Sequence, residues 1–161
     1  MPLWLILPAT IGFALVGQAP TLGGLSSKTP NPSKRPNILT VDDARAVRLL
    51  ARGALSGFEC DVEESDNGFK ALYVMDRILP DLILLDVKMP TMDGIEMLTL
   101  LATKPELKAI PVIMLISPGD HLVADQIAAL GVSATLMKPF TPAALIEKVR
   151  AILPLKPRSS L

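Results

Sequence analysis

The strongest constraint on the fold is an alternation of two hydrophobicity patterns that runs from residue 37 to residue 152. Short apolar runs of strand length alternate with longer stretches of helical period, a pattern typical of βα units around a parallel sheet. The predicted strands are 37–41, 59–64, 81–85, 112–116 and 134–137. The predicted helices are 44–55, 68–78, 94–102, 121–130 and 142–152. The sequence therefore predicts a doubly wound α/β domain with five parallel strands and five helices.

The texture of single segments refines this prediction. The third and fourth strands are continuously apolar, as expected for strands that helices cover on both faces, whereas the second is half polar and fits an edge. Thr141 followed by Pro142 predicts an N-cap and a first helical residue for the last helix. The expected strand order is 2-1-3-4-5, as in flavodoxin-like domains.

The first 36 residues differ from this domain. Residues 3–17 are strongly apolar, no charged side chain occurs before Lys28, and 26–36 form a polar, proline-broken linker. Three interpretations stay open for the apolar part: a signal-anchor, a cleaved signal, or an upstream extension. We expect a cytoplasmic protein in which only residues 3–25 could contact a membrane. The domain is expected over 37–153, followed by a short tail over 154–161.

Composition excludes several classes of function. Half of the residues are hydrophobic, which excludes a disordered chain. One cysteine and one histidine exclude a disulfide framework, a multi-cysteine zinc site and an all-histidine metal centre. The 16 basic and 16 acidic residues balance, so the charge gives no argument for nucleic-acid binding.

Acidic residues follow two of the predicted strands. Asp42 and Asp43 come after the first strand, Asp86 comes after the third and Lys138 follows the fifth. Ligands of such sheets bind beyond the carboxyl ends of the strands, and the first and third strands are neighbours, so the three acids should converge. Carboxylates without His or Cys suit Mg²⁺. One acid could then act as a nucleophile that forms an acyl phosphate, with Lys138 as a second positive charge on the phosphoryl oxygens.

At this point the chain resembles the response regulator receiver domains of two-component phosphorelays. The resemblance covers residues 37–153 and rests on four matches in order, namely Asp42–Asp43, the run from Asp86 to Pro90, Asp93–Gly94, and Lys138–Pro139–Phe140. Each match is weak alone, but the order and spacing together are highly specific. The family is expected to signal by protein contact, through its fourth helix, fifth strand and fifth helix.

The resemblance also implies roles for individual residues. Asp86 would accept phosphate from a histidine kinase or phosphotransfer protein. Asp43, Asp86 and the backbone carbonyl of Lys88 would ligate Mg²⁺ directly, and Asp42 would act through a metal-bound water. Lys138 would contact the phosphoryl group and form a cis peptide bond with Pro139.

Two positions depart from the family pattern. Where the family usually carries a switch hydroxyl, at the end of the fourth strand, this chain has Ile116. Ser117, one residue later, could supply the hydroxyl if the strand end shifts by one residue; otherwise strand alternation points it to the opposite side. Where the family tends to carry an aromatic partner of that hydroxyl, this chain has Thr135. A hydroxyl that bonds only in the active state contributes to the free-energy difference between states, so we expect its loss to weaken or reroute the switch.

Alternative functions remain at this stage. The leading one is a phosphorylatable receiver that catalyses only its own phosphoryl transfer and dephosphorylation, with an unidentified downstream protein and no direct nucleic-acid contact. The runner-up is a phosphorylation-independent pseudo-receiver that keeps the pocket as a relic. An aspartyl phosphatase is disfavoured because Lys88 stands where such enzymes usually place a second acid. The chain could also be a fragment of a longer protein.

Overall fold

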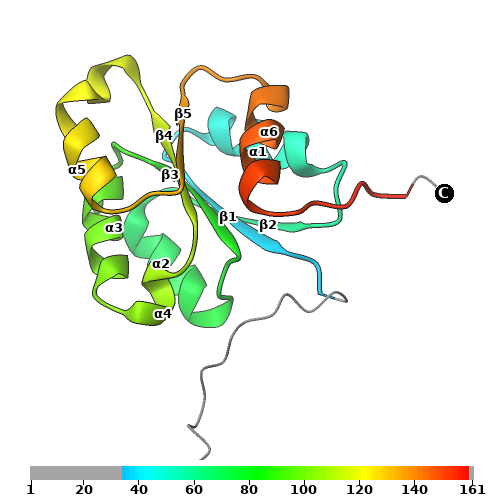
Figure 1. Cartoon of the computed structure of the whole chain (residues 1–161), viewed down its shortest axis with the longest axis horizontal. Coiled ribbons are helices and arrows are strands. Elements are labelled where there is room, and N and C mark those ends of the chain that lie inside the picture. The colour runs from blue at the N-terminus through cyan, green and yellow to red at the C-terminus, as the bar shows by residue number, and fades with distance from the viewer. Residues whose placement is uncertain (1–33, 160–161) are drawn as a thin grey trace, which may run out of the picture. The chain divides into compact units, whose positions relative to one another are not determined.

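A computed structural model describes residues 34–159. Its centre is a five-stranded parallel sheet in the order β2-β1-β3-β4-β5, which confirms the predicted topology (Figure 1). The strands are β1 (Asn37–Val41), β2 (Asp61–Ser65), β3 (Leu82–Asp86), β4 (Val112–Ile116) and β5 (Ala134–Met137). At the carboxyl edge, Val41 lies between Ser65 and Leu85 in register, so the ends of β1 and β3 are adjacent.

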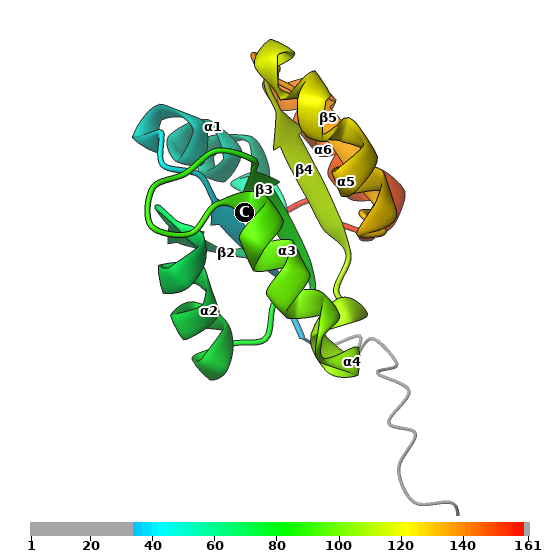
Figure 2. The same cartoon turned by 90° about the vertical axis from the view of Figure 1, so that its left-hand side faces the viewer.

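Helices cover both faces of the sheet (Figures 1 and 2). They are α1 (Arg45–Leu55), α2 (Gly68–Arg77), α3 (Gly94–Ala102), α4 (Pro105–Lys108), α5 (Ala124–Ala129) and α6 (Pro142–Ile152). Buried residues of α1 and α6 pack with Leu84 and Leu115 on one face, and those of α2, α3 and α5 pack with Leu85 and Met114 on the other. β3 is buried along its whole length, as its continuous apolar run predicts.

Caps fix where the helices begin. Thr141 accepts a hydrogen bond from the Ala144 backbone N–H at 3.2 Å, with Pro142 in the first turn, which confirms the predicted start of α6. Asp93 forms a capping box with Glu96 at the start of α3, through hydrogen bonds of 2.8 and 2.9 Å. Asp93 thus serves as a cap rather than as part of the acidic cluster.

Two helical segments differ from the sequence prediction. The stretch expected as one helix over 121–130 begins earlier, as a 3₁₀ turn η1 (Pro118–Val123), and becomes α-helical only in α5. It begins early because Pro118 occupies the first helical position and the Asp120 carboxylate accepts the Ser117 backbone N–H at 2.7 Å. The short helix α4 was not predicted, because a single turn is too short to show a helical period.

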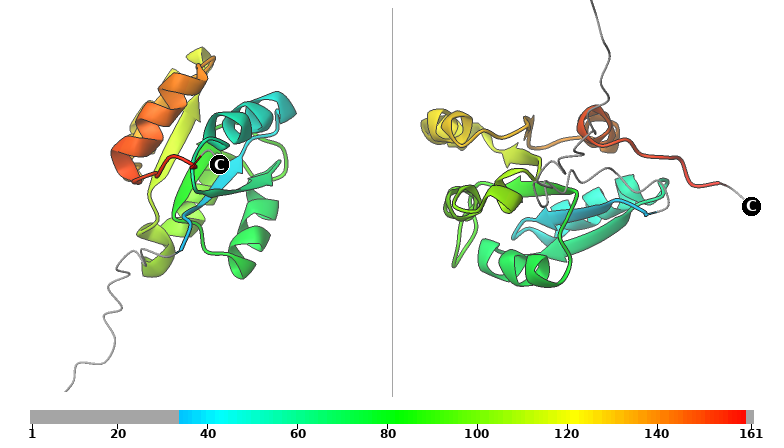
Figure 3. Two further views of the ribbon diagram at one scale, coloured as in Figure 1. Left: turned by 90° about the vertical axis from the view of Figure 1, so that its right-hand side faces the viewer. Right: turned by 60° about the horizontal axis from the view of Figure 1, so that its bottom comes forward.

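The C-terminal segment pairs with the turn before β2. Leu155 is buried, the Glu59 N–H donates to the Lys156 carbonyl at 2.8 Å, and the Arg158 N–H donates to the Gly57 carbonyl at 2.8 Å. Figure 3 shows this segment running on from the end of α6. The pairing explains why β2 begins at Asp61 and not at the expected residue 59, since Glu59 is bonded to the C-terminal segment instead.

The described residues begin at Lys34, so the segment predicted as an anchor, a signal or an extension lies almost wholly outside them. Within 34–159, no helix is both long enough and apolar enough to cross a bilayer.

Candidate functional site

The first part of the site is the turn after β1. Asp42 is fully buried, and its Oδ1 accepts the Ala44 backbone N–H at 2.8 Å. Asp43, the next residue, is exposed. Arg48 of α1 stabilises this turn, because its Nη1 donates hydrogen bonds to the carbonyl oxygens of Asp42 at 2.6 Å and Asp43 at 3.3 Å. The two adjacent acids therefore have different environments, one enclosed and one open to solvent.

The second part is Asp86, the last residue of β3, which is only 4% exposed. The start of α3 packs directly on its backbone, since the Gly94 N–H donates to the Val87 carbonyl at 2.9 Å. A Cβ at Gly94 would overlap the Asp86 carbonyl oxygen. Only glycine allows this close approach. The Asp93–Gly94 pair at the start of α3 therefore fixes the position of the Asp86 backbone at the edge of the sheet.

Lys138 joins the two buried acids. Its Nζ lies 2.6 Å from Asp42 Oδ2 and 2.8 Å from Asp86 Oδ1. It follows β5 and precedes a cis peptide bond to Pro139, which confirms the cis bond that the resemblance implied. One ammonium group thus bridges carboxylates that stand 44 residues apart in the sequence but on neighbouring strands.

Burial and charge shift the protonation of this cluster. Burial raises the pKa of Asp86; the hydrogen bond from Lys138 lowers it, the charges of Asp42 and Asp43 raise it further, and the balance is a raised pKa. Burial alone would lower the pKa of Lys138, but its hydrogen bonds to Asp42 and Asp86 outweigh burial and raise it. The cluster thus favours the charged form of Lys138 and disfavours the ionised form of Asp86 relative to an exposed carboxyl group.

The cluster has the donors of a hard-cation site. Asp42, Asp43 and Asp86 each offer a carboxylate oxygen, and these oxygens lie within 4.8 Å of one another. All three donors are oxygens, which suits Mg²⁺, and the exposed Asp43 leaves the site open to solvent for the waters that Mg²⁺ retains. These three carboxylates thus fit a site for the predicted ion.

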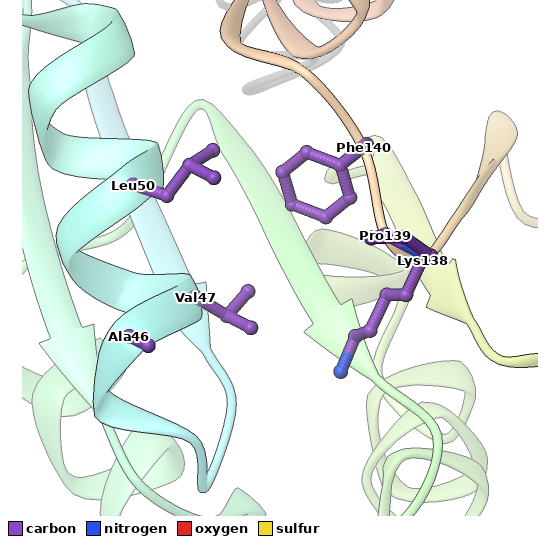
Figure 4. A pocket seen from close by; sticks show the side chains of 6 residues that line it. All are labelled: Ala46, Val47, Leu50, Lys138, Pro139 and Phe140. Atoms are coloured by element: carbon purple, nitrogen blue, oxygen red, sulfur yellow. The ribbon is translucent and has the colours of Figure 1, made fainter.

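An apolar hollow adjoins the cluster. It has a volume of about 310 Å³ and lies between α1 and the loop that follows β5. Figure 4 shows Val47 and Leu50 of α1 facing Phe140 across it, with Lys138 at one end. Sequence reasoning did not anticipate this hollow, although the apolar stripe of α1 and the Lys138–Pro139–Phe140 motif both contribute to it.

The predicted switch positions lie at the end of β4, directly after it, and within β5. Ile116 ends β4 and is partly buried against the core that α2, α3 and α5 cover. Ser117 is the N-cap residue of η1, where its backbone N–H is bound by Asp120. Thr135 lies on β5 beside Met114 and is exposed. An isoleucine side chain thus occupies the expected place of the switch hydroxyl.

Sequence reasoning missed a second ion pair close to the site. Lys88, two residues after Asp86, places its Nζ 3.0 Å from Oδ1 of Asp120 in η1. The Asp120 side chain is only 3% exposed, whereas that of Lys88 is 72% exposed. No spacing rule links these two residues, since the contact depends on how the loops after β3 and β4 meet.

Fold and site together define a flavodoxin-like α/β domain with an acidic, lysine-bridged cluster at its topological switch point. Comparison with known proteins agrees with this description. The family model for the response regulator receiver domain matches residues 38–150. The chain therefore belongs to the response regulator receiver domain family.

Individual relatives show the extent of the similarity. The chain is 34% identical over 122 residues to chemotaxis protein CheY-3 of Vibrio cholerae, covering 74% of this chain and 93% of that protein. It is 36% identical over 116 residues to transcriptional regulatory protein ResD of Bacillus subtilis, covering 72% of this chain and 47% of ResD, so it spans about half of that relative. The solved structure of chemotaxis response regulator CheY4 of Vibrio cholerae is similar with a TM-score of 0.69 and 28% identity, covering 74% of this chain and 100% of that chain.

Proposed function

We propose that this chain is a phosphorylatable receiver that takes a phosphoryl group onto Asp86 from a histidine kinase or phosphotransfer protein. The observation that carries the proposal is the bridging of Asp86 and Asp42 by Lys138, at 2.8 and 2.6 Å, beside the exposed Asp43. A buried nucleophile, a fixed ammonium group and a hard-cation site are together the requirements of aspartyl phosphorylation.

The chemistry follows from these positions. A carboxylate oxygen of Asp86 attacks the phosphorus of a phosphohistidine; the new O–P bond forms as the N–P bond breaks, and the imidazole nitrogen keeps that electron pair. Lys138 lies where its ammonium group can neutralise charge on the phosphoryl oxygens. Mg²⁺, held by Asp43, Asp86 and the Lys88 carbonyl, with Asp42 acting through water, would supply the remaining positive charge.

The same proposal covers what the protein does with the phosphoryl group. We infer that it acts on no separate substrate and catalyses only its own phosphorylation and dephosphorylation. Its output is contact with a downstream protein through the surface of η1, α5, β5 and α6. Exposed apolar side chains on this surface support that role, since Leu122 is 82% exposed and Met137 is 50% exposed. We expect no direct contact with nucleic acid.

Phosphorylation with acetyl phosphate and Mg²⁺ tests the proposal. Intact-mass spectrometry should show one added phosphoryl group on the wild-type protein and none on Asp86→Asn. Asp76→Asn, which changes an exposed acid on α2, is the matched control and should be labelled like the wild type. If no donor labels the wild-type protein, the phosphorylation-independent interaction module becomes the better explanation.

A further inference from the structure

Asp120 is a buried acid outside the acidic cluster. Its Oδ2 accepts the Ser117 backbone N–H at 2.7 Å, and Lys88 Nζ lies 3.0 Å from its Oδ1. Among the described residues, that Oδ1 atom has no conventional hydrogen bond, so the Lys88 ammonium is the interaction that compensates its burial. Asp120 in turn holds the backbone at the point where β4 passes into η1.

Separating the ion pair would cost Asp120 more free energy than Lys88. Lys88 is 72% exposed, so its ammonium group is already largely hydrated and would lose little. Asp120 is enclosed, and a buried carboxylate oxygen without a partner carries a desolvation penalty. Removal of Lys88 would therefore destabilise the position of η1 more than that of the β3–α3 loop.

We propose that Lys88 is a positioning residue that holds η1 in place through Asp120, and that a phosphoryl group on Asp86 draws Lys88 away and releases η1. The second half of this inference rests on the proposed function. Phosphorylation replaces the Asp86 carboxylate, which carries one negative charge, with an acyl phosphate whose phosphoryl group carries close to two, two residues along the chain from Lys88. The ammonium group of Lys88 then has a more strongly charged partner than the Asp120 carboxylate.

The electrostatics of Asp120 support this coupling. Burial would raise the pKa of the Asp120 carboxyl, but the hydrogen bond from the Ser117 N–H and the interaction with Lys88 outweigh burial and lower it. The charge of Lys138 lowers this pKa as well, so Asp120 lies within the field of the lysine that bridges Asp86.

The position of the pair also explains how signalling can proceed with Ile116 at the end of β4. Ile116 has no hydroxyl that could bind a phosphoryl group, yet the next residue, Ser117, has its N–H tied to Asp120. Movement of Lys88 would affect η1 by breaking its ion pair with Asp120, so no moving hydroxyl group is required. The released segment carries Leu122, whose side chain is already 82% exposed.

Amide hydrogen exchange measured by NMR tests the holding role in the unphosphorylated protein. Lys88→Met keeps a long side chain and removes the charge, and it should speed exchange of the Ser117 amide by about tenfold or more. Lys88→Arg should keep exchange slow. Lys148→Met, which changes an exposed lysine on α6, is the matched control and should exchange like the wild type. Unchanged exchange at Ser117 in Lys88→Met would overturn the holding role.

Beryllofluoride with Mg²⁺, a stand-in for the phosphoryl group, tests the release. It should speed exchange at Ser117 in the wild type and cause little further change in Lys88→Met. Equal acceleration in both proteins would show that release does not pass through Lys88. If beryllofluoride leaves the resonances of Asp42 and Asp43 unmoved, the proposed function fails and the release fails with it. In that case, the exchange rates of the Ser117 amide in the wild type and in Lys88→Met, both measured without Mg²⁺ and beryllofluoride, would still test the holding role.

Discussion

Neutralising the central acid should stabilise the metal-free domain. Asp86 is only 4% exposed and shares a single ammonium group, that of Lys138, with the buried Asp42, while Asp43 lies close by. Burial raises the pKa of Asp86 and, together with the two neighbouring acids, outweighs the hydrogen bond from Lys138. Because the ionised form is disfavoured in the folded state, Asp86→Asn should raise the free energy of unfolding without Mg²⁺, by about 1 kcal/mol, the usual size of a stabilising single substitution. For a domain of this size that corresponds to roughly 3–5 °C in Tm.

The pH dependence of this difference has a definite sign. A carboxyl group whose pKa is raised by folding binds its proton more tightly in the folded state, so it favours folding below its unfolded pKa of about 3.9. That contribution is lost as the pH rises through the raised pKa of folded Asp86. The advantage of Asp86→Asn over the wild type should therefore be absent in strong acid, grow above about pH 4 and become constant once folded Asp86 is ionised.

Thermal unfolding followed by circular dichroism, in EDTA and in Mg²⁺, measures both effects. A cation that binds only the folded state adds about 1.4 kcal/mol at ten times its Kd, so Mg²⁺ should stabilise the wild type. Asp86→Asn should gain less from Mg²⁺ because one ligand has lost its charge, and Asp76→Asn should behave like the wild type in both buffers. A Tm of Asp86→Asn at or below that of the wild type in EDTA at neutral pH would refute the reasoning. It would mean that the ion pair with Lys138 outweighs burial and repulsion.

Three further substitutions test parts of the fold. Thr91 lies in the β3–α3 loop with φ of 72°, which is unfavourable for a β-branched residue, so Thr91→Asn should raise the urea-unfolding free energy by about 0.5–1 kcal/mol. Gly94→Ala should cost roughly 2 kcal/mol or more and abolish the Mg²⁺-dependent rise in Tm, because a Cβ there collides with the Asp86 carbonyl. Leu155→Ala should cost about 2–4 kcal/mol in the same urea experiment, whereas the exposed Lys156→Ala should cost almost nothing; equal effects would argue that the C-terminal segment does not pack as described.

The sheet and the acidic cluster could be predicted from the sequence because each depends on a local signal and one rule of topology. Continuous apolar runs marked β3 and β4, and the order of a doubly wound sheet placed the end of β1 beside the end of β3. Asp42 and Asp86 each end or follow such a strand, so their convergence required no knowledge of the loops. The cis bond before Pro139 came from the family resemblance instead.

The missed contacts all join segments that no periodic pattern relates. The C-terminal segment pairs with the turn at Gly57 through backbone groups, which every residue carries, so its side chains gave no signal. No sequence signal singled out Arg48, although its guanidinium group binds the carbonyl oxygens of the β1–α1 turn. In each case the partner is the main chain, and the sequence does not record which backbone groups are left to be satisfied.

The pair of Lys88 and Asp120 shows the same limit for charged side chains, with a functional consequence. In the sequence, a loop lysine and an acid near a helix start are each well explained by solvent or by a cap. Asp120 does act as a cap, since it binds the Ser117 N–H, but capping engages one carboxylate oxygen and leaves the other buried beside Lys88. The Asp120 cap is therefore stable only while the Lys88 ammonium group stays beside its second oxygen. Since Lys88 is two residues from Asp86, the start of η1 depends on the charge at the proposed phosphorylation site.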